Sequence, residues 1–330
     1  MRIPLFKKLH AEGLVSDSAL QKTEALELKP LLSLYWELRL LLYLGVLLLT
    51  GGLGILVYKN IDSIGHQAVL AFIALITAGS FYYCLRKKAP FSWEKISSPD
   101  PFFDYILLLG CLSLLIFLGY LQYEYDTFGD HYGLATFIPM MILFIAAYYF
   151  DHLGVLSLAI TNLAAWAGIA ITPLSILKTG NFADDHLIYT GIILAVILLL
   201  IARLTQQRRL KPHFETTYTN FGMHLFFIAA LTGFFTHDTT YGLLWFLGLA
   251  VFAVYAYIQA MARQSFYFIL VTVLYSYIAL SALVVRLLSA VSDGSSGMVF
   301  LGLLYFILSA LGTAVLLVRL NRQLKPHDSL

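Results

Sequence analysis

Charged residues are scarce in this sequence. Asp, Glu, Lys and Arg together make up 12% of the 330 residues, whereas 60% are apolar. A soluble domain is typically about half apolar and a quarter charged. With a mean hydropathy of +0.81, a water-soluble globule of this composition would expose a large apolar surface. The composition therefore excludes an ordinary soluble domain and indicates the lipid bilayer as the surroundings of the chain.

Cysteines and recognisable catalytic motifs are also few. Cys84 and Cys111 both lie in apolar runs and have no CxxC or Cys/His neighbour, so we expect them to be small buried residues. The chain has no phosphate-binding GxxxxGK[ST] loop, HExxH, GxSxG or dinucleotide fingerprint. It also lacks the basic stripe that binds nucleic acid. We therefore predict no catalytic residue, no cofactor and a non-enzymatic protein.

Long apolar runs are what the sequence has in abundance. A bilayer core of about 30 Å requires about 20 apolar residues in a helix, and ten segments approach or exceed this length. They predict an all-α, polytopic transmembrane bundle of about ten spans. The fourth and fifth spans are very closely spaced, and so are the eighth and ninth. Each pair could form either a tight hairpin of two helices, which we favour, or one long bent helix. The predicted spans are Leu40–Tyr58, Gln67–Leu85, Phe102–Tyr123, Tyr132–Phe150, Leu153–Thr172, Leu187–Ala202, Thr217–Thr236, Tyr241–Ala262, Ser265–Val285 and Gly297–Val318.

The distribution of basic residues predicts the orientation. With the N-terminus inside, 18 of the 21 Lys and Arg residues fall on the cytoplasmic side, and only Lys59, Lys178 and Arg286 fall outside. This asymmetry follows the positive-inside rule and predicts an even number of spans with both termini in the cytoplasm. The first apolar run begins near Leu40, behind a polar segment too long for the start of a signal peptide. We expect a multi-pass protein of a bacterial inner membrane.

The sequence divides into a short N-terminal module, a bundle and a tail. Residues 1–38 predict a cytoplasmic helical hairpin and its approach to the membrane, residues 39–319 the transmembrane bundle, and residues 320–330 a cytoplasmic tail. Within the hairpin, Gly13 suits the end of one helix and Ser16 the start of the next. A hairpin of this size is too small to fold alone, so we expect it to dock on the membrane or on a protein partner.

Three stretches near the N-terminus resemble a known family. They are residues 9–17 (LHAEGLVSD), the glycine-rich first span from Leu40 (LLLYLGVLLLTGGLGILV) and the polar exit Asn60-Ile61-Asp62. Together they are similar to a bacterial family of predicted membrane proteins, domain of unknown function number 2157. Its members often carry Trp beside the exit Asp, where this chain has Ile61. The resemblance implies membrane location and this layout, and it implies no activity.

Glycines and polar residues within the spans are the first candidates for a functional role. Gly45 and Gly52 lie seven residues apart on one helix face, which favours close helix packing; an unwound segment lining a substrate path is the alternative. Asn162, Asn220 and His224 lie within apolar spans, where polar groups are functional candidates. Asn220 and His224 are four apart and share a face. For His224 we favour a hydrogen bond between helices over a proton relay or a metal ligand.

The predicted outer loops supply the metal-site candidates. Four of them pair an Asp with a nearby His, and carboxylates and imidazoles are common ligands of divalent metals. If these loops converged, they could build a metal site outside the cell, although Asp and His are also ordinary polar residues of short loops. The histidines concerned are His66, His131, His186 and His237.

These observations leave three functional interpretations. The first is a non-enzymatic scaffold or sensor whose N-terminal hairpin docks a partner. The second is a secondary transporter of a small solute, built from two five-span halves. The third is a metal-dependent membrane hydrolase that uses the outer Asp and His residues. The first is favoured, because intramembrane charge is scarce. The sequence leaves the oligomeric state open.

Overall fold

The computed structural model describes residues 10–12, 15–16, 34–100, 102–129, 131–171, 184–237, 239–291 and 296–324. Over these residues the chain forms ten α-helices, one short 3₁₀ helix and no strand, which confirms the predicted all-α class. Each of the ten predicted apolar segments coincides with one α-helix. The elements are α3 (Leu34–Ile64), α4 (His66–Lys87), α5 (Phe103–Tyr125), α6 (Tyr132–Phe150), α7 (Leu153–Ile171), α9 (Asp185–Arg208), η1 (Pro212–Phe214), α10 (Glu215–Thr236), α11 (Thr239–Ala262), α12 (Phe266–Val291) and α13 (Ser296–Leu324).

Most of these helices can cross a bilayer. In the described part of the chain, eight stretches are long and apolar enough to do so, namely those of α4, α5, α6, α9, α10, α11, α12 and α13. Two further helices, α3 and α7, contribute shorter apolar stretches, Leu40–Ile55 and Leu153–Gly168. The helices are apolar around their whole circumference, as expected where lipid rather than water surrounds them.

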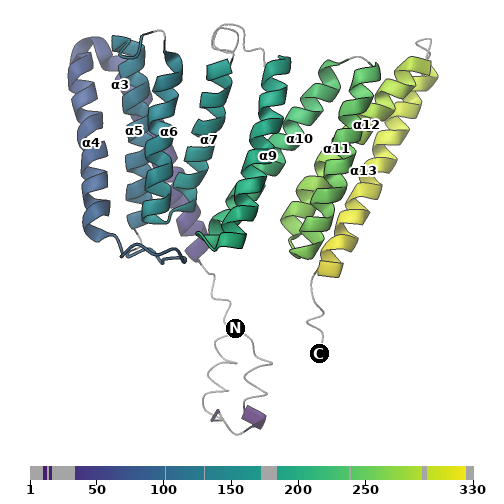
Figure 1. Ribbon diagram of the computed structural model, residues 1–330, viewed down its shortest axis with the longest axis horizontal. Coiled ribbons are helices and arrows are strands. Elements are labelled where there is room, and N and C mark those ends of the chain that lie inside the picture. The colour runs from purple at the N-terminus through teal and green to yellow at the C-terminus, as the bar shows by residue number, and fades with distance from the viewer. Residues whose placement is uncertain are drawn as a thin grey trace. The chain divides into compact units, whose positions relative to one another are not determined.

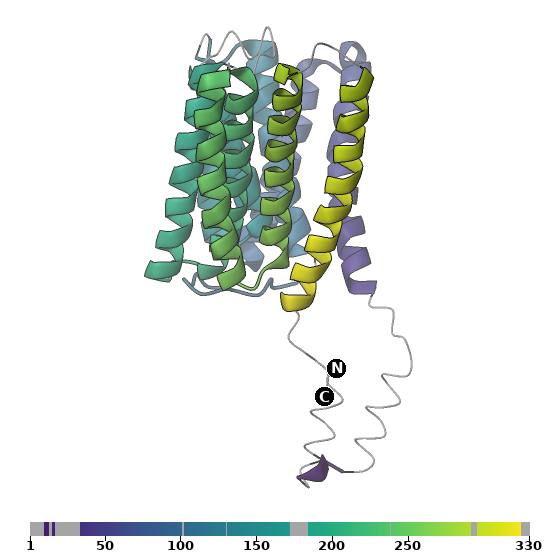
Figure 2. The same cartoon turned by 90° about the vertical axis from the view of Figure 1, so that its right-hand side faces the viewer.

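The chain forms two compact units, Met1–Val69 and Leu70–Leu330. In the second unit the helices run alternately up and down, and helices that follow one another along the chain pack side by side (Figures 1 and 2). The α4–α5, α6–α7, α9–α10 and α11–α12 connections all lie at one end of this unit, the lower end in Figure 1, where α13 also ends. We call this end of the second unit the basic end.

Two buried clusters hold the second unit together. The first joins α4, α5, α6, α7, α9, η1 and α10 through side chains such as Leu107, Leu143 and Phe214. The second joins α10, α11 and α12 around Phe227 and Ile269. Since lipid tails are as apolar as these side chains, close van der Waals contact rather than the hydrophobic effect stabilises the helix pairs.

Close contacts at glycine occur where helices of the second unit meet. A Cβ built at Gly222 would lie 2.9 Å from Leu199 Cγ, and one at Gly233 would lie 2.6 Å from Trp245 Cδ2. Gly45 and Gly52 lie on α3, in the first unit, and no described heavy atom lies within 4 Å of a Cβ built at either. The packing role predicted for these two residues stays a prediction.

The two connections that the sequence left open, between the fourth and fifth and between the eighth and ninth predicted spans, are tight hairpins between separate helices, as favoured from the sequence. Asp151 ends α6 in the left-handed conformation, with φ of 59°, and α7 begins two residues later at Leu153. Gln264, with φ of 50°, turns the chain between α11 and α12. Of the predicted N-terminal module, residues 1–38, most lies outside the described residues, and residues 34–38 belong to α3; the end of the predicted tail, 325–330, also lies outside them.

Candidate functional site

A buried ionic cluster lies at the basic end. The Asp151 side chain, 2% exposed, ends α6, and its Oδ1 lies 2.9 Å from Lys211 Nζ and 2.7 Å from His213 Nε2. Its Oδ2 accepts a 2.6 Å hydrogen bond from the backbone N–H of Ile96. We call Asp151, Lys211 and His213 the Asp151 cluster. It connects the α4–α5, α6–α7 and α9–α10 loops and so fixes three connections to one carboxylate.

The local backbone brings these groups together. Asp151 and Lys211 both adopt positive φ, 59° and 54°, a conformation that is costly for residues other than glycine and persists where surrounding contacts determine it. The Lys211 N–H donates to the Trp93 carbonyl at 3.0 Å, and its ammonium lies 5.1 Å from the centre of the Phe91 ring. The Lys211 side chain is fully buried, and in the described part of the chain Asp151 supplies its only ion pair.

The electrostatics of the loops follow from these contacts. Burial raises the pKa of Asp151, but the Ile96 N–H, the Lys211 ammonium and His213 together lower it further, so that the net pKa lies below its ordinary value. The pKa of Asp100, in the α4–α5 loop, is also lowered: burial raises it, and hydrogen bonds from Tyr83 and from the backbone of Phe102 and Phe103 outweigh that effect. Both carboxylates are therefore charged at neutral pH.

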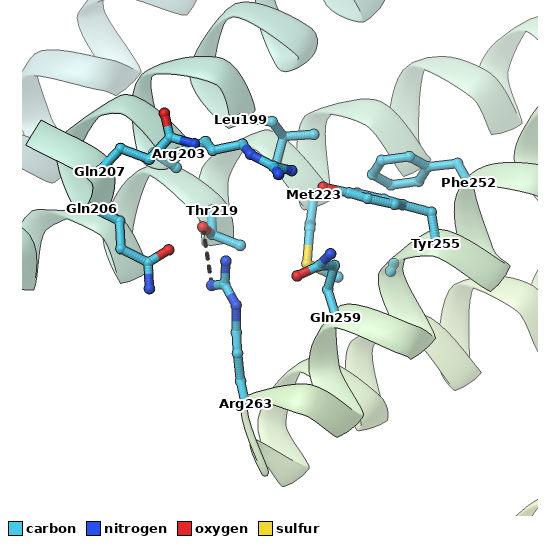
Figure 3. A pocket seen from close by; sticks show the side chains of 12 residues that line it. Leu199, Arg203, Gln206, Gln207, Thr219, Met223, Phe252, Tyr255, Gln259 and Arg263 are labelled. Atoms are coloured by element: carbon cyan, nitrogen blue, oxygen red, sulfur yellow. Dashed lines mark hydrogen bonds between the residues drawn. The ribbon is translucent and has the colours of Figure 1, made fainter.

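A polar cavity opens toward the basic end, between α9, α10 and α11. It has a volume of about 230 Å³. Figure 3 shows Arg203 extending into it from α9 and Arg263 reaching from the end of α11 toward Thr219. Amide side chains also line the cavity, and its inner wall is apolar. The remaining lining residues are Leu199, Ala202, Gln206, Gln207, Met223, Phe252, Tyr255, Ala256 and Gln259.

The two arginines of the cavity differ in their partners. Arg263 Nη1 lies 2.5 Å from Glu215 Oε1 and donates to Thr219 Oγ1 at 3.3 Å, while Thr219 Oγ1 donates to Glu215 Oε1 at 2.9 Å. Glu215 is buried in the first turn of α10, where a negative charge suits the helix N-terminus. Arg203 forms no ion pair with any of the described residues. The cavity therefore holds two guanidinium groups against one carboxylate.

The polar residues predicted within the spans lie mostly between helices. His224 on α10 contacts two tyrosines of α12, with Nδ1 2.9 Å from Tyr275 Oη and Nε2 3.1 Å from Tyr267 Oη. Tyr267 Oη also donates to Asn220 Oδ1 at 2.7 Å, so Asn220 and His224 share both a face and a partner. Asn162 instead donates to the Leu158 carbonyl of its own helix at 3.3 Å.

The outer-loop histidines do not gather into a metal site in the part of the chain that the structure describes. His237 Nε2 lies 3.2 Å from Asp185 Oδ1, which brings two of the predicted loops together. His66, His131 and His186 join no cluster of three described metal-ligating side chains. The metal-dependent hydrolase stays a prediction, since the side chains of three of the four paired aspartates lie outside the described residues.

One basic residue at the opposite end has a structural role. Arg286 of α12 donates to the backbone carbonyls of Phe234 and, at 3.2 Å, Phe235 at the end of α10. Its guanidinium also lies 4.1 Å from the centre of the Phe234 ring. The last carbonyls of a helix lack intrahelical donors, so Arg286 satisfies groups that would otherwise be left without a partner.

The comparisons with known proteins point to one family. Residues 7–156 match the model of the family described as "Predicted membrane protein (DUF2157)". The resemblance of the N-terminal stretches to this family is confirmed. The matched residues are similar to a family of predicted membrane proteins of unknown function, and the described part of the chain has several helices capable of crossing the bilayer. No curated protein and no solved structure matches.

The sequence did not single out the residues that build the basic end. Three of them, Arg203, Lys211 and Arg263, were counted only as basic residues that indicate the orientation. His213 was not among the candidates. A signal for the Asp151 cluster was available, since Lys211 and His213 flank Pro212 in the six-residue connection between α9 and α10, where a charged side chain stays close to the helix ends. Their partner, 60 residues away, is found only by folding.

Proposed function

We propose that the protein is a non-enzymatic scaffold or sensor of a bacterial inner membrane, with about ten spans and both termini in the cytoplasm. The observation that supports this best is the way the second unit satisfies its polar side chains. Asn220, His224, Tyr267 and Tyr275 bond to one another across α10 and α12. Groups satisfied in this way join helices of the second unit, as polar side chains in a scaffold do.

The cavities support the same interpretation. A secondary transporter binds its solute near the middle of the membrane, between polar groups of discontinuous helices. A cavity of about 380 Å³ between α7, α9 and α10 is lined mostly by Ala, Gly, Leu and Ile. The polar cavity beside Arg203 and Arg263 lies at the basic end instead. A bundle whose polar cavity lies at one end suits a protein that binds partners at that end.

The charge distribution supports the orientation. Of the twelve Lys and Arg residues described in the second unit, eleven lie at the basic end, and the exception is Arg286. Under the positive-inside rule the basic end faces the cytoplasm. The Asp151 cluster and the polar cavity would then face the cytoplasm, where a cytoplasmic partner can contact them.

Labelling of introduced cysteines tests both the transporter alternative and the orientation. The two native cysteines, Cys84 and Cys111, are buried and unpaired and are first replaced by alanine. Asn162→Cys is then treated with a membrane-impermeant maleimide in intact and in inverted membranes, beside loop controls Asp126→Cys and Arg209→Cys. We expect Asp126→Cys to react from outside, Arg209→Cys from inside and Asn162→Cys from neither. Reaction of Asn162→Cys would establish a water-filled path and overturn the scaffold proposal in favour of the transporter.

Docking by the hairpin is tested in the native membrane. A photoreactive residue at Leu9 or Leu20 is compared with the same residue at Asp126, on a loop at the opposite end from the basic end. We expect a discrete cross-linked species from the hairpin positions that persists through purification and is absent from the control. Cross-links only to lipid, or the same species from all three positions, would remove the partner from the proposal.

A further inference from the structure

The polar cavity at the basic end has the composition of a binding site rather than of a packing defect. It contains two guanidinium groups, three primary amides and the Thr219 hydroxyl. Guanidinium groups bind planar oxyanions with two parallel hydrogen bonds, and amide N–H groups add neutral donors. With Glu215 as the neighbouring carboxylate, these side chains carry a net charge of +1. The chemistry of the cavity therefore selects an anion.

One of the two arginines is available to a ligand. Glu215 and Thr219 hold Arg263 in place, whereas Arg203 reaches into the same cavity (Figure 3) without an ion pair among the described residues. A free arginine beside a fixed one can close on a bound oxyanion. A positive charge near the C-terminal end of α9 is favourable whichever way its side chain points. This effect therefore does not explain why Arg203 points toward α11.

The shape of the cavity indicates what kind of anion it takes. Its volume of about 230 Å³ is below the roughly 300 to 1,000 Å³ of pockets that enclose drug-sized ligands. Apolar side chains, Leu199, Met223 and Phe252, form the wall that leads away from the arginines along the helices. Tyr255 at the rim is 45% exposed, as an amphipathic ring at headgroup depth would be. A phosphate group fits the polar part, and acyl chains fit the apolar wall.

We propose that the cavity between α9, α10 and α11 binds a phosphate-bearing anion, the headgroup of an anionic phospholipid, with Arg203 and Arg263 on the phosphate. Basic pockets between helices are a known way in which membrane proteins hold anionic headgroups. The proposal rests on the cavity alone and is independent of whether the protein is a scaffold or a transporter. It gives a sensor a ligand drawn from the membrane itself.

The test uses the purified full chain in a neutral detergent, with three soluble probes. They are dioctanoyl phosphatidylglycerol, dioctanoylglycerol, which has the chains without the phosphate, and inorganic phosphate, which has no chains. Binding is measured by native mass spectrometry and by ligand-dependent thermal stabilisation. We expect dioctanoyl phosphatidylglycerol to bind at least about tenfold more tightly than either other probe. A tenfold difference corresponds to about 1.4 kcal/mol of binding free energy.

Matched variants assign the binding to the cavity. Arg203→Gln should weaken binding of dioctanoyl phosphatidylglycerol by about tenfold, and Arg208→Gln, the same change on the same helix outside the cavity, should leave it unchanged. Arg203 is exposed, so its replacement should leave the thermal stability of the free protein unaltered. A double variant, Arg263→Gln with Glu215→Gln, removes the second guanidinium without leaving its buried carboxylate alone, and should weaken binding to a similar extent.

Three outcomes would overturn the proposal. Equal effects of Arg203→Gln and Arg208→Gln would mean a general attraction to a basic surface. Equal binding of dioctanoylglycerol would mean an apolar site without a role for phosphate. Inorganic phosphate binding as tightly as the lipid, with the same dependence on Arg203, would assign the site to a soluble ion and remove the lipid from the proposal.

Discussion

Replacing Asp151 by Asn tests whether the buried cluster holds the basic end together. The substitution keeps the shape of the side chain and removes its charge. Asn also tolerates the left-handed conformation of Asp151, so the substitution adds no backbone strain. What changes is the ion pair with Lys211, which is fully buried, and the contact with His213.

The expected loss follows from the geometry. Two unit charges 2.9 Å apart, the distance from Asp151 Oδ1 to Lys211 Nζ, attract by about 6 kcal/mol at an effective dielectric constant of about 20. Desolvation of both groups offsets most of this attraction in the intact pair, but removing one partner leaves the other buried and uncompensated. Such changes cost about 3–5 kcal/mol of the free energy of unfolding. We expect Asp151→Asn and Lys211→Met each to fall in this range.

The assay is reversible unfolding in mixed micelles, followed by tryptophan fluorescence. The double variant Asp151→Asn with Lys211→Met buries no unpaired charge of the original pair, so its loss should be well below the sum of the two single losses. Asp126→Asn is the matched control, because Asp126 also ends a helix with positive φ but is exposed; its effect should stay within about 0.5 kcal/mol.

Either of two results would refute the reasoning. A loss for Asp151→Asn no larger than that for Asp126→Asn would show that the cluster does not stabilise the fold. Additive losses in the double variant would show that Asp151 and Lys211 act through separate contacts and not as a pair.

The remaining predictions concern pH and helix packing. The pKa of Asp151 is lowered in the folded protein, so its contribution to the free energy of unfolding is fully present above the ordinary value of 3.8. This contribution is lost as the pH falls through the lower pKa of the folded state. The free energy of unfolding measured against pH should show this loss in the wild type and not in Asp151→Asn. Gly233→Ala would place a methyl group 2.6 Å from the Trp245 ring and should cost about 1–3 kcal/mol, whereas Gly248→Ala, with no atom within 4 Å, should cost nothing; equal unfolding free energies would contradict the close packing of α10 and α11. Tyr267→Phe removes the hydroxyl shared between α10 and α12 and should cost about 0.6–1.7 kcal/mol; a wild-type unfolding curve would mean that these hydrogen bonds do not join the helices.

The helices were predictable because the bilayer imposes a simple requirement. Every backbone group in hydrocarbon must be satisfied within its own segment, so an apolar run of sufficient length forms a helix whatever its neighbours are. The predicted span Tyr132–Phe150 has the bounds of α6, and the tight hairpins at Asp151 and Gln264 were favoured from the shortness of the polar connections alone. The sequence also indicated that Asn220 and His224 share a face, because helical periodicity is local.

The contacts between helices could not be predicted from the sequence, because most positions in these helices are apolar. Any face of such a helix can meet another, so composition does not identify the contacting pairs. Gly233 meets Trp245 on the next helix, while the glycines of the first span, which the sequence singled out, have no such neighbour among the described residues. For the same reason the sequence could not say which tyrosines satisfy His224.

Only the tertiary structure brought together the groups that carry the proposals. Asp151 lies in the short connection after α6, and Lys211 and His213 reach it from a connection 60 residues away. Arg203 and Arg263 face one cavity because α9 and α11 both pack on α10. The sequence by itself determined that the chain is a membrane protein and which residues form its helices, since those properties depend on local hydrophobicity and length. The folded structure decided which charges meet, because charge pairing depends on distances that the linear order of residues does not contain.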